Sequence, residues 1–124
     1  MSMDLKQLIA RMAEQRSRWV EIEPGKKVRV LRPIESELPK FMDRRDGEVY
    51  WSCSFAQVKV VVDAWKGVTE ADLIEGGADD ELPFAPELWE ALVGDHVAFA
   101  KPVQAAVIDL ISEHRHSLDS IEKN

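Results

Sequence analysis

One stretch constrains the fold more than any other part of the chain, and it reads WVEIEPGKKVRVLRP from Trp19 to Pro33. Apolar and acidic residues alternate from Val20 to Glu23, and valines alternate with basic residues after the turn signal Pro24-Gly25. A period of two residues is that of a strand with one buried face. The stretch therefore predicts a β-hairpin. Its loop, PGKK, is longer than a two-residue turn, which leaves the strand register open.

A helix is predicted before this hairpin, from Asp4 to Trp19. Charged residues occupy positions between the apolar ones, so the helix is expected to be amphipathic. The apolar residues at near-helical spacing are Leu5, Leu8, Ile9, Met12 and Trp19.

Weaker signals follow the hairpin. We expect a short, irregular helix from Glu35 to Arg45, a turn at Asp46-Gly47 and a third strand within Glu48 to Phe55.

The next segment, from Ser54 to Gly67, fits two structures. Apolar residues at i, i+3, i+7 and i+10 favour a helix from Ser54, ended by Gly67, and these residues are Phe55, Val58, Val62 and Trp65. The β-branched run from 58 to 62 instead fits a strand. We favour the helix.

The rest of the chain reads as helical. Thr69 is placed to cap a single turn, Pro86 to begin a helix that Gly94 stops, and Pro102 to begin a long final helix. The expected apolar face of that last helix comprises Val103, Val107, Leu110, Ile111, Leu118 and Ile121. The predicted fold is a single α+β domain over residues 1–124. A small antiparallel sheet (19–51) follows an N-terminal helix (1–18) and packs with a predominantly helical region (52–124).

Charge is distributed unevenly along the chain, whose net charge is −7. Residues 1–62 carry 12 basic and 9 acidic residues, whereas residues 63–124 carry 4 and 14. An acidic half is a poor surface for nucleic acid, so we expect no nucleic-acid partner. The basic half could contact an acidic partner or the acidic half of a neighbouring copy. No apolar run is long enough to cross a membrane and no secretory signal is visible, so we expect a cytoplasmic protein.

Residues that could carry chemistry lack the spacing that chemistry requires. His114 and His116 are two apart, whereas zinc pairs on helices prefer three or four. No nucleophile signature surrounds Cys53, the only cysteine. An enzyme would need a pocket that gathers His96 or these residues with acids. We therefore expect a protein that is not an enzyme and needs no metal or cofactor.

A second motif joins the two halves of the chain. It runs VVDAWKGVTEADL, then an acidic loop containing glycine, then LPFAPELWEALVGDHVAFAKPV. This arrangement resembles tail assembly chaperones of tailed bacteriophages, in which a Trp-x-Gly seam and a PF-x-P-E element flank a variable acidic loop. The residues that carry the resemblance are Trp65, Gly67, Val68, Leu82, Pro83, Phe84, Pro86, Glu87, Leu88, Trp89 and Leu92.

The resemblance implies a function in the cytoplasm of a bacterial host. Such proteins bind the long, helical tape-measure protein during tail assembly and keep it soluble, and a homo-oligomer is expected. The alternative is a minor tail or head–tail completion protein that remains in the virion. We expect the contact surface to include the first helix, through Leu8, Met12 and Trp19, together with the final helix.

Overall fold

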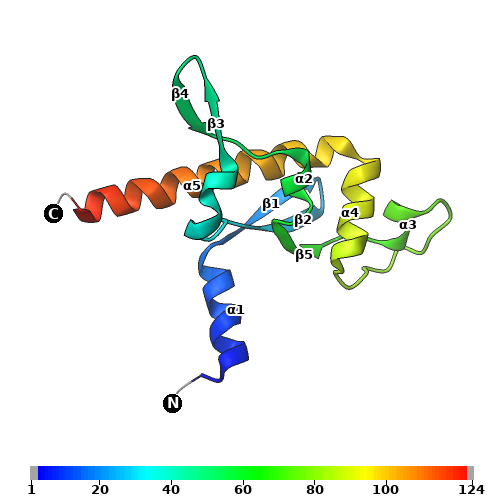
Figure 1. The fold of residues 1–124 in the computed structure, drawn as a ribbon. Helices are drawn as coiled ribbons and strands as arrows, with labels where there is room; N and C mark the ends of the chain where they lie inside the picture. Colours follow the sequence, from blue (N-terminus) through cyan, green and yellow to red (C-terminus); the bar gives the residue numbers. More distant parts are fainter. Residues whose placement is uncertain (1–2, 123–124) are drawn as a thin grey trace.

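A three-stranded antiparallel sheet carries a projecting helix at one end and packs against a long C-terminal helix (Figure 1). This arrangement is that of a computed structural model, which describes residues 3–122. The elements before the third strand of that sheet are α1 (Leu5–Gln15), β1 (Ser17–Glu23), β2 (Lys26–Leu31), the 3₁₀ helix η1 (Glu35–Phe41), β3 (Met42–Arg45), β4 (Glu48–Trp51) and α2 (Phe55–Val58). The others are β5 (Val62–Lys66), α3 (Glu70–Leu73), α4 (Pro86–Asp95), the 3₁₀ helix η2 (Val97–Phe99) and α5 (Ala100–Glu122).

The predicted hairpin is confirmed as β1 and β2, with a shorter turn than expected. Lys26 already pairs with Glu23, so only Pro24 and Gly25 connect the strands, and a register shift between Glu21 and Glu23 absorbs the difference. Gly25 has φ +83°, a backbone conformation that glycine adopts without steric cost. The expectation of a longer PGKK loop was therefore wrong.

The helix predicted from Ser54 to Trp65 was wrong over most of its length. Ser54 does cap a helix, but that helix is the single turn α2, and the chain then enters strand β5. β5 pairs with β2, which places Trp65 opposite Val28 and Val62 opposite Val30 on the buried face of the sheet. Pairing with a strand distant in sequence thus outweighs a local helical pattern that the same apolar positions also satisfy.

Two other boundaries also differ from the expectation. α1 ends at Gln15, so Trp19 belongs to β1 rather than to the first helix. Only the first part of the predicted helix from Glu35 is helical, because the chain becomes strand β3 at Met42. β3 and β4 form a separate two-stranded sheet, so the third strand expected around residues 48–55 does not join the main sheet.

The hydrophobic core lies between the main sheet, α4 and α5. Val28 and Val30 face this core from β2, and Trp89 enters it from α4 with no exposed surface. The long helix begins at Ala100, two residues before the predicted start, and its buried side chains include Val103, Val107 and Ile111. These layers confirm an α+β fold with a small antiparallel sheet in the N-terminal half.

Gly67 connects β5 to the turn that precedes α3, and its backbone requires glycine. Its φ is +83°, and a Cβ built there would lie 2.0 Å from the carbonyl oxygen of Gly25.

We expect Gly67→Ala to lower the free energy of unfolding by more than ~1 kcal/mol, because it combines backbone strain with a steric clash. Gly94→Ala is the matched control. A Cβ at Gly94 meets nothing within 4 Å, and alanine in helix α4 should stabilise by about 0.5–1 kcal/mol. Urea unfolding of both variants tests the pair, and equal effects would contradict the explanation.

Candidate functional site

Helix α1 exposes an apolar face that nothing in the described structure covers. Asp4 begins the helix with a capping box, in which its side chain accepts from the Gln7 N–H at 2.8 Å and the Gln7 side chain accepts from the Asp4 N–H at 3.2 Å. No residue of α1 is buried, and the helix projects from the body (Figure 1). The α1 apolar face, as we name it, consists of Leu5 (74% exposed), Leu8 (49%), Ile9 (58%) and Met12 (59%). An amphipathic helix of a soluble protein ordinarily buries such a face.

Basic residues flank this apolar face on both sides. At 3.6 residues per turn, Lys6 and Arg11 project about 110° to either side of its centre, and Glu14 lies on the opposite side of the helix. Within residues 3–122, neither Lys6 nor Arg11 forms an ion pair. The face therefore presents an apolar stripe between two free cations.

The base of α1 is attached to the body by hydrogen bonds. The backbone N–H of Arg32 donates to the Arg16 carbonyl at 2.7 Å, and Nε of Arg16 donates to the Arg32 carbonyl at 3.2 Å. Burial, together with the charge of Arg16, lowers the pKa of Arg32 below its usual value. Beside this attachment Met12 borders a hollow of about 450 Å³, where His114 and Glu35 meet at 2.9 Å. Helix α1 is therefore held to the body at its base, and its remaining turns project from the body.

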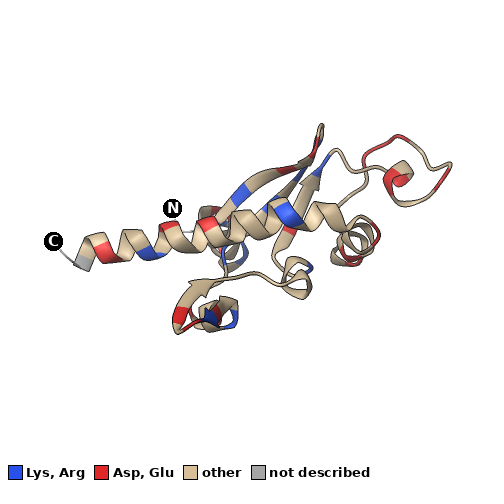
Figure 2. Ribbon diagram, turned by 90° about the horizontal axis from the view of Figure 1, so that it is seen from above, with Lys and Arg blue, Asp and Glu red and all other residues tan. Residues whose placement is uncertain are grey.

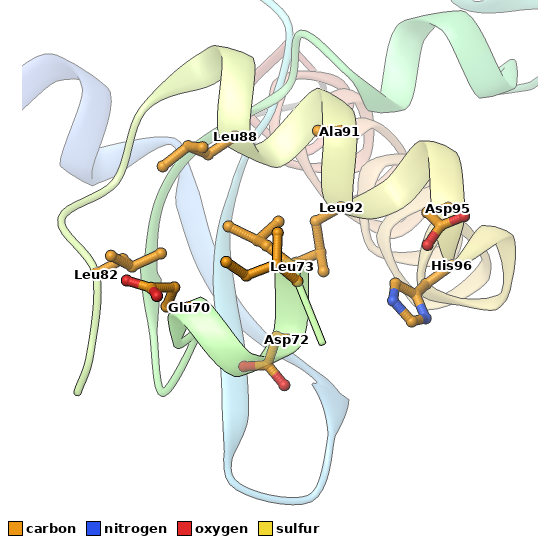
Figure 3. Close-up of a pocket in the computed structure, with 10 residues that line it drawn as sticks. Glu70, Asp72, Leu73, Leu82, Leu88, Ala91, Leu92, Asp95 and His96 are labelled. Carbon is orange, nitrogen blue, oxygen red and sulfur yellow. The ribbon is translucent and has the colours of Figure 1, made fainter. Parts of the chain in front are cut away.

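A second surface feature lies between α3 and α4. This α3–α4 groove has a volume of about 420 Å³ and mostly apolar walls (Figure 3). Its apolar lining consists of Leu73, Ile74, Leu82, Leu88, Ala91 and Leu92. Four polar residues complete the lining: Glu70, Asp72, Asp95 and His96. Trp65 holds the loop that forms one side of the groove, because its Nε1 donates to the Leu82 carbonyl at 2.8 Å and its ring packs edge-on against Phe84.

Acidic residues border the groove from both of its helices. Figure 2 shows Asp and Glu concentrated on α3 and the loop after it. Asp72 pairs with Lys26 at 3.3 Å and accepts from the backbone N–H of Thr69 at 2.8 Å. Desolvation alone would raise the pKa of Asp72, but the hydrogen bonds from Thr69 and the ion pair with Lys26 outweigh it and lower that pKa. Glu70 and Asp95 have no ion-pair partner among residues 3–122.

The lowered pKa of Asp72 makes its contribution to stability dependent on pH. Because the folded-state pKa lies below the unfolded value of 3.8, the contribution is present above that value and is lost as pH falls through the folded pKa. We expect Asp72→Asn to cost about 0.5–1 kcal/mol at pH 7, since the amide still accepts from Thr69 but loses the attraction of Lys26. The difference from the unsubstituted chain should shrink below pH 4. Thermal unfolding across pH 3–7 measures it, and a difference that stays constant would contradict this role.

The motif around Trp65 comes together next to the groove. Trp65, Val68, Trp89 and Leu92 are buried, and Phe84 is half-buried. Leu82, Leu88 and Leu92 line the groove itself, whereas Pro83, Pro86 and Glu87 are exposed. The motif residues therefore shape the groove wall as well as the core.

The proposed contact residues do not form one surface. Leu8 and Met12 share the α1 apolar face, whereas Trp19 is 40% exposed on β1, with Nζ of Lys66 4.3 Å from its ring centroid. The final helix turns most of its predicted apolar face into the core, although Ile121 remains 69% exposed. The sequence did not predict the groove, because the acidic residues that border it, Glu70 and Asp95, are 25 positions apart in the chain.

The residues considered for chemistry lie at separate places. Cys53 is buried, and desolvation raises its pKa to about 11. His96 stacks on Phe99 at the end of the groove, His114 contacts Glu35, and His116 is exposed. In the described part of the chain, no three His, Cys, Asp or Glu residues are placed to hold a metal ion. No helix of that part is long and apolar enough to span a membrane.

Comparison of the chain with protein-family models, curated proteins and solved structures found no match. The resemblance to tail assembly chaperones therefore rests on the motif around Trp65 and Phe84. The α1 apolar face and the α3–α4 groove are features of the folded chain and are observed whether or not that resemblance holds.

Proposed function

We propose that this chain is a protein-binding assembly chaperone that covers an apolar helical segment of its client with the α1 apolar face. One observation carries the proposal: four large apolar side chains project from a helix that buries none of its residues. Burying such a side chain contributes about 1.5–3 kcal/mol. Four of them can offset the cost of association and support a reversible complex.

The client that fits best is the tape-measure protein of a bacteriophage tail. The motif around Trp65 and Phe84 supports this identity, through its resemblance to tail assembly chaperones. A tape-measure protein is long and helical, so several copies of a weak binder could cover it side by side. In this proposal the chain acts in the cytoplasm of the bacterial host, is a homo-oligomer until it binds its client, and needs no cofactor or catalytic step.

Co-expression with a tape-measure protein encoded in the same genome tests the proposal. We expect the tape-measure protein to copurify with this chain and its soluble fraction to rise severalfold. The chain should be absent from purified virions, because a chaperone leaves before assembly is complete. Its presence there, detected by mass spectrometry, would favour a minor tail or head–tail completion protein. A tape-measure protein that neither binds nor gains solubility would overturn the proposal.

A further inference from the structure

We propose that the α3–α4 groove of one copy receives helix α1 of a second copy. The α1 apolar face would then be covered by another copy of the chain when no client is present, and by the client when one is bound. The docking follows from the groove and the helix alone. Only the competition with a client rests on the proposed function.

The apolar surfaces of the two partners match in kind. The groove has leucines on both walls, among them Leu73 from α3 and Leu92 from α4 (Figure 3). Helix α1 offers Leu8, Ile9 and Met12 along one side, each at least 49% exposed. A helix laid in an apolar groove is a recurring mode of protein recognition, with anchors at i, i+3, i+4 and i+7. Leu5, Leu8, Ile9 and Met12 have this spacing.

The charges on either side of the two apolar surfaces are opposite. Lys6 and Arg11 flank the stripe on α1, one on each side, whereas Glu70 and Asp95 border the groove from α3 and α4. All four are without an ion-pair partner in the described structure, so docking can pair them without breaking an existing contact. Complementary borders of this kind favour one orientation and speed association. An anionic helix would be repelled by the same border.

The helix of the same chain cannot reach its own groove. α1 joins the sheet at Ser17, which lies opposite Leu31, whereas the groove lies near the hairpin turn, where Lys26 contacts Asp72. β1 has seven residues and separates these points by roughly 20 Å. Figure 1 shows α1 projecting at the bottom of the molecule and α3 at its right-hand side. The contact must therefore be made between copies.

A contact between unlike surfaces closes with two copies only when it is reciprocal, with each α1 in the groove of the other copy. A one-way pair leaves one α1 and one groove free, so assembly then continues until a ring closes or concentration limits it. One 11-residue helix in a groove is a small interface of the transient class, below about 1,200 Å². Association should therefore be weak and dependent on concentration, which allows a client to displace it.

Charge exchange between the two surfaces tests the docking. Sedimentation velocity across a range of concentrations should show oligomers of the unsubstituted chain. Lys6→Glu with Arg11→Glu, and separately Glu70→Lys with Asp95→Lys, should each weaken self-association at least about tenfold, because like charges then meet. Mixing the two double variants should restore association, since the reversed helix matches the reversed groove. Lys101→Glu and Asp109→Lys are the matched controls, as both residues are exposed elsewhere, and neither should change assembly.

Three outcomes would overturn the docking. One is a chain that stays monomeric at all concentrations, another is a groove variant that assembles normally, and the third is a mixture of the two double variants that stays apart. If the groove pair impairs folding, Ala91→Glu tests the same surface, because Ala91 is exposed on helix α4 and glutamate is a good helix former.

The proposed function is tested separately. The groove variant should still solubilise the tape-measure protein, so a loss of self-association alone supports the docking, and a failure of client binding alone affects only the chaperone proposal.

Discussion

Replacing Trp89 by alanine is expected to lower the free energy of unfolding by about 3–5 kcal/mol, the range for a large aromatic side chain lost from a core. Trp89 has no exposed surface, and its Nε1 donates to the Val58 carbonyl at 3.0 Å. The residue therefore joins α4 to α2 by both packing and a hydrogen bond. Truncation leaves a cavity and removes the donor for a buried carbonyl, and both effects destabilise.

Two further variants separate these contributions. Trp89→Phe keeps most of the apolar volume but loses the Nε1–H donor, so a smaller loss of about 1–3 kcal/mol is expected. Met42→Ala is a surface control, since its side chain is 42% exposed, and it should change stability by less than about 0.5 kcal/mol. Guanidinium unfolding measures all three. A loss below 1 kcal/mol for Trp89→Ala would contradict the placement of this side chain in the core.

The second large effect concerns binding. Leu8→Glu combined with Ile9→Glu should weaken binding of the tape-measure protein about 100-fold or more, because each buried side chain contributes about 1.5–3 kcal/mol. Folding should be nearly unaffected, since both side chains are already exposed in the unbound chain and glutamate is a good helix former. Isothermal titration calorimetry with a soluble tape-measure fragment measures the dissociation constant, and circular dichroism checks the fold.

Exposed apolar residues on the body provide the matched control for this pair. Val60 is 74% exposed and Val97 is 66% exposed, comparable to the residues of α1. Val60→Glu with Val97→Glu adds the same charge and removes apolar area from residues outside α1. Binding should then change less than about threefold, within the usual effect of a surface substitution. Equal losses for the two double variants would show that charge, rather than the α1 face, decides binding.

Local sequence patterns predicted those parts of the fold that depend on local interactions. The hairpin around Pro24-Gly25 and the Thr69-capped turn were predicted, because alternation and capping act over a few residues. The segment from Phe55 to Trp65 was not, since its apolar spacing fits a helix whereas its β-branched run fits a strand. Pairing of β5 with β2, some 35 residues earlier, decides between them. No local pattern contains that information.

The candidate site was predictable only in part, for a related reason. The amphipathic pattern of α1 is visible in the sequence, but a helix that buries its apolar face and a helix that exposes it have the same pattern. Only the folded structure shows that Leu8 and Met12 remain exposed. The groove depends on tertiary structure still more, because Glu70 and Asp95 come to line the same groove only through the packing of α3 against α4.

Hydrogen exchange along α1 tests the central claim, that its apolar face is the binding surface. An 11-residue helix without tertiary packing is only marginally stable in water, so its amides should exchange rapidly in dilute, unbound protein. Addition of a soluble tape-measure fragment should slow exchange at the hydrogen-bonded amides of residues 9–15 by at least about tenfold, while β3 and β4 remain unchanged. Protection of another element with α1 still exchanging rapidly would contradict the account.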